Sequence, residues 1–135
     1  MPAVLIVEDE IGVRRVLGLA LAHLGYTVAE ADSVDSACDA LAAFTGGFDL
    51  IVLDLNLPDE SGWEFMRRLN AGLPGMPPAV PARRTPPILV MSAVRPTQRR
   101  LEEFHPAGLL LKPFPIDTLL RQVERLLSRA TLAGR

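Results

Sequence analysis

Five short apolar runs alternate with segments of helical periodicity along the chain of 135 residues. Continuous apolar runs of this length are typical of strands buried on both faces of a parallel sheet. The 26–31 run is more polar than the others, which favours a position at the edge of a sheet. The five predicted strands span residues 3–7, 26–31, 48–53, 87–91 and 108–111.

The intervening segments repeat apolar side chains every three or four positions, the spacing of one helix face. Ser33 is a good N-cap for the second helix, Gly25 ends the first, and Pro106 ends a short fourth helix. The predicted helices span residues 11–24, 34–44, 62–70, 97–104 and 116–129. Repeated strand–helix units with right-handed crossovers predict an α/β protein. We expect the flavodoxin-like (βα)5 doubly wound fold, a parallel five-stranded sheet in the order 2-1-3-4-5, as a single domain over residues 1–135.

Residues 72–87 break this alternation because they are rich in proline and glycine. Such a composition cannot continue a helix. We interpret the segment as an extended, solvated loop before the fourth strand, with a proline-rich docking segment as the alternative.

The overall charge and composition exclude several classes of protein. The formal net charge of −2 offers no general basic surface, so we expect no direct binding to nucleic acid or to anionic membranes. The single cysteine, Cys38, excludes an internal disulfide. No apolar stretch is long enough to span a bilayer, and the N-terminus lacks the basic start of a signal peptide. We therefore expect a cytoplasmic protein.

Charged and hydroxyl side chains stand directly after four of the five predicted strands. Glu8 and Asp9 follow the first strand, Asp54 the third, Ser92 the fourth and Lys112 the fifth. In the predicted strand order these four strands are neighbours, and ligands of such sheets bind beyond the carboxyl ends of the strands. The five side chains are therefore expected to converge on one crevice.

This combination of groups favours phosphoryl chemistry. Carboxylates gathered in one crevice repel one another unless a cation neutralises them, and Mg²⁺ suits a site with few carboxylates and an incoming phosphate. Lys112 adds a mobile positive charge, and the Ser92 hydroxyl can donate a hydrogen bond to a phosphoryl oxygen. An aspartate can attack phosphorus to form an acyl phosphate, and Asp54 is the central candidate. Each residue alone has an ordinary explanation, such as capping a helix, so the prediction depends on their conjunction.

With these residues assembled, the sequence resembles the receiver domain of bacterial two-component response regulators. The stretches that carry the resemblance are LIVEDE (5–10), LIVLDLNLPDESG (50–62), ILVMSA (88–93) and LLLKPF (109–114). The resemblance covers essentially the whole chain. The resemblance implies a signalling module that switches protein–protein interactions and performs only its own phosphorylation and dephosphorylation chemistry. It also implies a monomer or a phosphorylation-dependent dimer, either stand-alone or part of a longer regulator.

The resemblance assigns a role to each residue of the phosphorylation site. Asp54 would accept a phosphoryl group from a sensor histidine kinase or a phosphotransfer protein. Ser92 matches the hydroxyl residue that moves to meet the phosphoryl group. Lys112 matches the family's lysine, whose bond to Pro113 is typically cis.

The resemblance also implies a set of Mg²⁺ ligands. Glu8 and Asp9 match the family's acidic pair, of which Asp9 is the more direct ligand. Asp54 itself contributes an oxygen, and the main-chain carbonyl two residues later, that of Asn56, completes the protein ligands.

Three features depart from the family pattern. Leu109 stands where the family usually has a tyrosine or phenylalanine that couples to the Ser/Thr residue. The loop at 72–87 is longer than usual, and the segment from Ser92 to Lys112 is short, with Pro96 in its first part. Because the fourth helix belongs to the family's usual output face, we hypothesise an atypical output surface.

Three alternatives stay open at this point. The chain could be a receiver-fold scaffold that works without phosphorylation, which the absent aromatic at Leu109 favours slightly. An aspartate-nucleophile phosphatase of the haloacid dehalogenase type would need a second aspartate two residues after Asp54, where the chain has Asn56. A flavodoxin-like cofactor carrier would need a phosphate loop after the first strand, where this chain is acidic.

Overall fold

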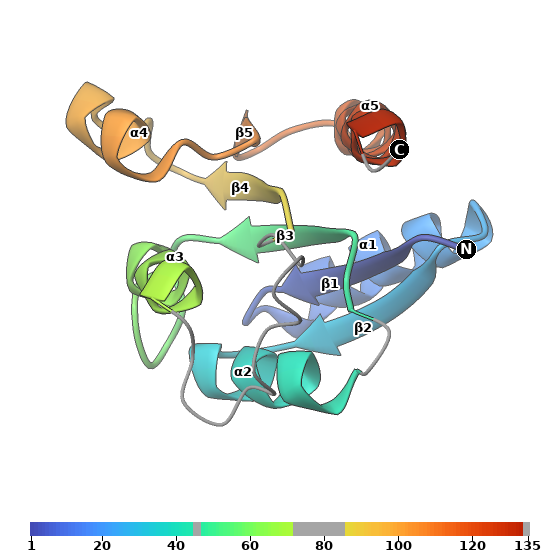
Figure 1. Ribbon diagram of the computed structural model, residues 1–135, viewed down its shortest axis with the longest axis horizontal. Helices are drawn as coiled ribbons and strands as arrows, with labels where there is room; N and C mark the ends of the chain where they lie inside the picture. Colours follow the sequence, from blue (N-terminus) through green and yellow to red (C-terminus); the bar gives the residue numbers. More distant parts are fainter. Residues whose placement is uncertain (45–46, 72–85, 134–135) are drawn as a thin grey trace.

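A computed structural model describes residues 1–44, 47–71 and 86–133 of the chain. Within these ranges, strands and helices alternate as predicted (Figure 1). The strands are β1 (Ala3–Val7), β2 (Thr27–Ala31), β3 (Leu50–Asp54), β4 (Ile88–Ser92) and β5 (Gly108–Leu111). The helices are α1 (Ile11–His23), α2 (Val34–Ala43), α3 (Gly62–Ala71), α4 (Gln98–Phe104) and α5 (Ile116–Ala133). No described helix is both long and apolar enough to cross a membrane. The predicted loop at 72–87 lies, except for its last two residues, outside the described residues.

All five strands are parallel, in the order β2-β1-β3-β4-β5, which confirms the predicted topology (Figure 1). Every residue of β1, β3 and β4 is buried, whereas β2 is only partly buried at the sheet edge, as its polar sequence indicates. Asp54 and Ser92 are the last residues of β3 and β4, one position beyond the predicted strand ends. The ladder extends that far because Asp54 pairs with Met91 and the Leu55 N–H donates to the Met91 carbonyl at 3.0 Å.

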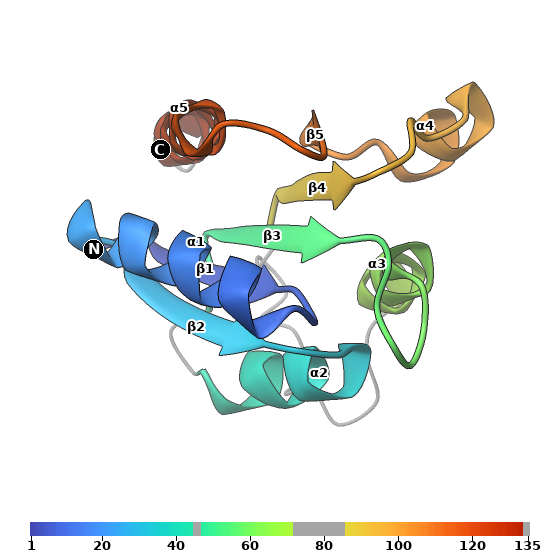
Figure 2. The same ribbon diagram turned by 180° about the vertical axis from the view of Figure 1, so that it is seen from behind.

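Helices cover both faces of the sheet. Along β1, Leu5 and Val7 belong to one apolar cluster with residues of α2, α3 and α4, while Val4 and Ile6 belong to a second with residues of α1 and α5. This division follows from the two-residue side-chain period of a strand. Figures 1 and 2 view the sheet from opposite sides, and α1 lies in front of it in Figure 2. The strands are thus held between two apolar layers, which leaves their carboxyl ends as the exposed polar edge.

Local signals set the ends of several helices. Gly25 follows α1 with a φ of 95°, a conformation that glycine adopts without strain. Ser33 caps α2 by accepting from the Ser36 N–H at 3.1 Å, and Thr97 caps α4 by accepting from the Arg100 N–H at 3.2 Å. His105 ends α4 in the left-handed region, at a φ of 47°. The fourth helix is therefore short, as its flanking sequence predicts.

The loop after β3 is fastened to the start of α2 by Asp59, a contact that was not predicted from the sequence. The Asp59 carboxylate accepts from the N–H groups of Val34, Asp35 and Glu60, each at 3.0 Å. Desolvation acts to raise the pKa of Asp59, but hydrogen bonds from backbone N–H groups outweigh it and hold the pKa below its usual value. Asp59 thus caps α2 from a neighbouring loop.

We predict that Asp59→Ala lowers the free energy of unfolding by about 1 kcal/mol at neutral pH, the usual cost of losing a cap. Because the pKa of Asp59 is lower in the folded state, its contribution is present above the ordinary value of 3.8 and is lost as the pH falls through the folded-state pKa. Urea unfolding at neutral and acidic pH measures both effects. Asp39→Ala, an exposed change on α2, the helix that Asp59 caps, is the control. An equal loss at both pH values would contradict this role.

Candidate functional site

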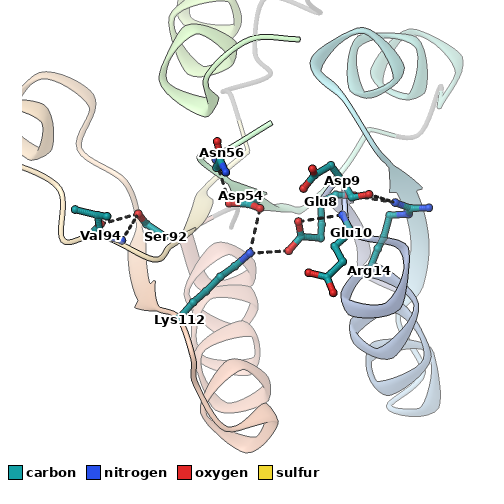
Figure 3. Close-up of polar contacts among 9 residues, drawn as sticks. All are labelled: Glu8, Asp9, Glu10, Arg14, Asp54, Asn56, Ser92, Val94 and Lys112. Carbon is teal, nitrogen blue, oxygen red and sulfur yellow. Dashed lines mark hydrogen bonds and ion pairs between the residues drawn. The ribbon is translucent and has the colours of Figure 1, made fainter. Parts of the chain in front are cut away.

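Lys112, Glu8 and Asp54 form a cluster of opposite charges at the carboxyl ends of the strands (Figure 3). The Lys112 Nζ atom lies 2.7 Å from Glu8 Oε1 and 3.1 Å from Asp54 Oδ2. Both carboxylates are buried, and the lysine side chain is 28% exposed. Lys112 follows the edge strand β5, so its long side chain reaches past β4 to the residues that end β3 and follow β1. The Lys112–Pro113 bond is cis, as the resemblance implies.

Asp9 completes a group of three acids. One carboxylate oxygen from each of Glu8, Asp9 and Asp54 can be chosen so that all lie within 4.8 Å of one another. Asp9 is exposed, whereas the other two are buried, so the group opens to solvent on the side of Asp9. An all-oxygen donor set suits a hard divalent cation. A single lysine balances only part of the negative charge, and the donor set therefore fits Mg²⁺.

The environment of the cluster shifts two of its pKa values. Burial, followed by the hydrogen bond with Asp54, raises the pKa of Glu8 to about 7, although Lys112 opposes the shift. Burial acts to lower the pKa of Lys112, but its bonds to Glu8 and Asp54 outweigh burial and raise that pKa. Lys112 therefore stays positively charged at neutral pH. The Glu8 carboxyl group changes between its protonated and ionised forms in that range.

The local backbone fixes the orientation of Asp54. Its Oδ1 atom accepts from the Asn56 N–H at 3.1 Å, while Oδ2 faces Lys112. Gly62, the first residue of α3, donates its N–H to the Leu55 carbonyl at 2.9 Å. A Cβ atom on Gly62 would lie 2.8 Å from the Leu55 Cα and 2.9 Å from the Asp54 carbonyl oxygen. The absent side chain thus lets α3 begin directly against the exit of β3.

Ser92 ends β4 at the rim of the cluster, but its hydroxyl points elsewhere (Figure 3). The hydroxyl donates to the Val94 carbonyl at 2.6 Å and accepts from the Val94 N–H at 3.1 Å. Of the predicted residues, the structure thus brings together the side chains of Glu8, Asp9, Asp54 and Lys112, and leaves the Ser92 hydroxyl outside.

Arg14 also contacts this site, although it was not predicted from the sequence. Its Nη1 atom donates to the Glu8 carbonyl oxygen at 2.8 Å, and its Nε atom lies 3.3 Å from Glu30 Oε1. An arginine in the first turns of a helix is usually solvated. The sequence offers one signal for this contact. Arg14 lies close enough to Glu8 and Asp9 along the chain for its long side chain to contact their main chain.

Comparison with known proteins agrees with this geometry. The family model for the response regulator receiver domain matches residues 4–124. The transcriptional regulatory protein CusR of Escherichia coli K12 is 35% identical over 128 residues, which cover 93% of this chain and 51% of CusR. The response regulator ArlR of Staphylococcus aureus Mu50 is 32% identical, over 96% of this chain and 54% of ArlR. The chain spans about half the length of these curated relatives.

Solved structures show the same fold. The non-phosphorylated HemR receiver domain of Leptospira biflexa superposes with a TM-score of 0.76 at 29% identity, covering 95% of each chain. The chemotaxis response regulator CheY4 of Vibrio cholerae gives a TM-score of 0.77 at 26% identity, covering 93% of this chain and 98% of CheY4. Because the family model spans most of the chain and the acids gather around the predicted phosphoacceptor, this chain belongs to the receiver domain family of two-component response regulators.

Proposed function

We propose that this receiver domain accepts a phosphoryl group on Asp54 from the phosphohistidine of a sensor histidine kinase or phosphotransfer protein, and thereby switches its protein–protein interactions. The observation that carries the proposal is the position of the Asp54 carboxylate. It ends a fully buried strand, with Lys112 Nζ 3.1 Å from one oxygen and two further acids beside it. A carboxylate held this way is oriented before its phosphoryl donor arrives.

In the proposed reaction, an Asp54 carboxylate oxygen attacks the phosphorus atom of the phosphohistidine. The P–N bond breaks, the imidazole nitrogen keeps the electron pair, and the new O–P bond makes an acyl phosphate. Lys112 lies where it can transfer one of its contacts from Asp54 to a phosphoryl oxygen. Ser92 would first give up its hydrogen bonds to Val94 and then donate to a second phosphoryl oxygen.

The acids of this site would hold Mg²⁺ during the reaction. Oxygen ligands would come from Asp9 and Asp54, from Glu8 beside them, and from the main-chain carbonyl of Asn56. When bound, the ion supplies positive charge that offsets the repulsion between these acids and the incoming phosphoryl group. The exposed position of Asp9 leaves the cluster accessible to a hydrated ion.

The other candidate functions have less support. A scaffold that works without phosphorylation has no need of a lysine placed between two buried acids. A haloacid-dehalogenase-type phosphatase needs an acid two residues after Asp54, whereas Asn56 contributes a backbone N–H bond to that carboxylate. Leu109 replaces the usual aromatic residue. Its side chain packs against the apolar core, which does not include the acids and lysine of the site.

We predict that a small acyl-phosphate donor with Mg²⁺ adds one phosphoryl group to the parent chain, measured by intact mass. Asp54→Asn should show no adduct because it lacks the carboxylate nucleophile, and chelating the metal should also abolish the adduct. Asp39→Asn, an exposed substitution on α2, serves as the matched control and should be modified like the parent. An equal adduct on Asp54→Asn, or none on a folded parent that binds Mg²⁺, would contradict the proposal.

We also predict that Mg²⁺ affinity rises with pH. The pKa of Glu8 is about 7 without the metal. Below that pH, Mg²⁺ has to displace a proton from Glu8, whereas above that pH it binds a site that is already ionised. The dissociation constant should fall roughly tenfold between about pH 6 and pH 8. Titration calorimetry at the two pH values measures the change. Glu8→Gln should remove most of the pH dependence, and a parent affinity that is the same at both values would refute the assignment.

A further inference from the structure

The guanidinium group of Arg14 contacts the main chain of the loop that carries Glu8 and Asp9. Its Nη1 atom donates to the Glu8 carbonyl at 2.8 Å and contacts the Asp9 carbonyl at 3.5 Å. Figure 3 shows Arg14 on the side of this loop opposite Lys112. The arginine therefore binds the main chain that carries the acids, while the lysine faces their carboxylates.

Arg14 is itself held in place from the edge of the sheet. Its Nε atom lies 3.3 Å from Glu30 Oε1 on β2, and its side chain is only 13% exposed. The planar fork of an arginine lets one nitrogen bind the loop while another binds a carboxylate. Gly18, one turn further along α1, makes room for Glu30, because a Cβ atom there would lie 3.1 Å from Glu30 Oε2. A glycine inside a helix costs about 1 kcal/mol, so close packing is a reason for its presence.

Among the described residues, the loop that carries Asp9 makes few other hydrogen bonds to the rest of the fold. The Glu8 N–H donates to the Ala31 carbonyl at 3.0 Å, just beyond the last paired residues of β1 and β2. After that bond, Asp9 and Glu10 belong to no strand or helix. Glu10 stands at the N-cap of α1 without a side-chain cap hydrogen bond, and its N–H reaches Glu8 Oε2 only at 3.4 Å. Arg14 thus joins this loop to the edge strand.

We propose that Arg14, oriented by Glu30, is a positioning residue that holds the Glu8–Asp9 loop in the arrangement required for binding Mg²⁺. The inference rests on the proposed function because it concerns the same metal site. Loss of the guanidinium frees the loop, which lets the Asp9 carboxylate move away from Asp54 and weakens Mg²⁺ binding. Charge alone predicts the opposite, since removing a nearby cation strengthens the attraction between the acids and Mg²⁺. The direction of the change therefore separates positioning from simple electrostatics.

The test compares Arg14→Met with Arg15→Met by titration calorimetry with Mg²⁺ alone. Arg15 is the matched control because it is the adjacent arginine, is exposed, and has no hydrogen bond or ion pair among the described residues. Arg14→Met is expected to weaken Mg²⁺ binding about tenfold, the low end of the usual effect of losing an outer-shell partner. Arg15→Met is expected to leave the affinity unchanged or slightly higher. Mg²⁺ binding by Arg14→Met that equals or exceeds that of the parent overturns the proposal.

Two further measurements keep the proposal testable. One distinguishes positioning from a purely structural role, and the other does not depend on whether Arg14→Met folds. Thermal unfolding with the metal chelated reports stability, so a lower melting temperature with unchanged Mg²⁺ affinity overturns the positioning role. Glu30→Gln removes the orienting partner from a more exposed site, and Asp32→Asn controls for the lost negative charge. Glu30→Gln is expected to weaken Mg²⁺ binding more than Asp32→Asn does, and equal effects overturn the proposal.

Failure of this inference differs from failure of the proposed function. A folded parent chain that binds no Mg²⁺ and gains no phosphoryl group refutes both. A parent that binds Mg²⁺ and is phosphorylated on Asp54, beside an Arg14→Met variant with the parent's Mg²⁺ affinity, refutes only the role of Arg14.

Discussion

The site depends on the contact of one lysine with two buried acids. Glu8 and Asp54 lie side by side where strands β1 and β3 end, and such a pair repels itself in a medium of low dielectric. Lys112 supplies the compensating charge from a residue far along the chain, beyond the opposite edge strand. Removing one partner from a buried ion pair typically costs about 3–5 kcal/mol, because the remaining charge is left uncompensated. The same contact therefore links the residues that follow β1 and β5 to the end of β3 and orients the proposed phosphoacceptor.

The surroundings of this cluster combine loops that are held by neighbouring elements with one hydroxyl that bonds outside the cluster. Arg14 anchors the loop after β1 to β2, and Asp59 anchors the loop after β3 to α2. Gly62 allows α3 to begin against the strand exit. The Ser92 hydroxyl, in contrast, bonds to the main chain of Val94, two residues further along. An oriented acidic cluster beside a hydroxyl that bonds outside it suits the proposed function, in which Ser92 turns toward the phosphoryl group after modification.

Two of the three departures from the family pattern, Leu109 and the short segment from Ser92 to Lys112, lie around α4. Where the family usually has an aromatic residue, Leu109 packs against the core together with Trp63 and Phe104. The rings of Trp63 and Phe104 stack at 5.0 Å between α3 and the end of α4. The aromatic pair therefore lies between α3 and α4 and not on β5. The atypical output surface inferred from the sequence stays a prediction.

The sequence by itself determined the elements, their order and the strand-end positions of the site residues. Each of these depends on local patterns: short apolar runs, helical periodicity, and single polar residues such as Asp54 at the exit of a strand. Tertiary structure decided the direction of the Ser92 hydroxyl, the raised pKa of Glu8 and the contacts of Arg14 and Asp59. These properties depend on how loops and helices pack after folding, and on burial and distances of a few ångströms. A one-dimensional pattern of hydrophobic and polar residues does not encode those quantities.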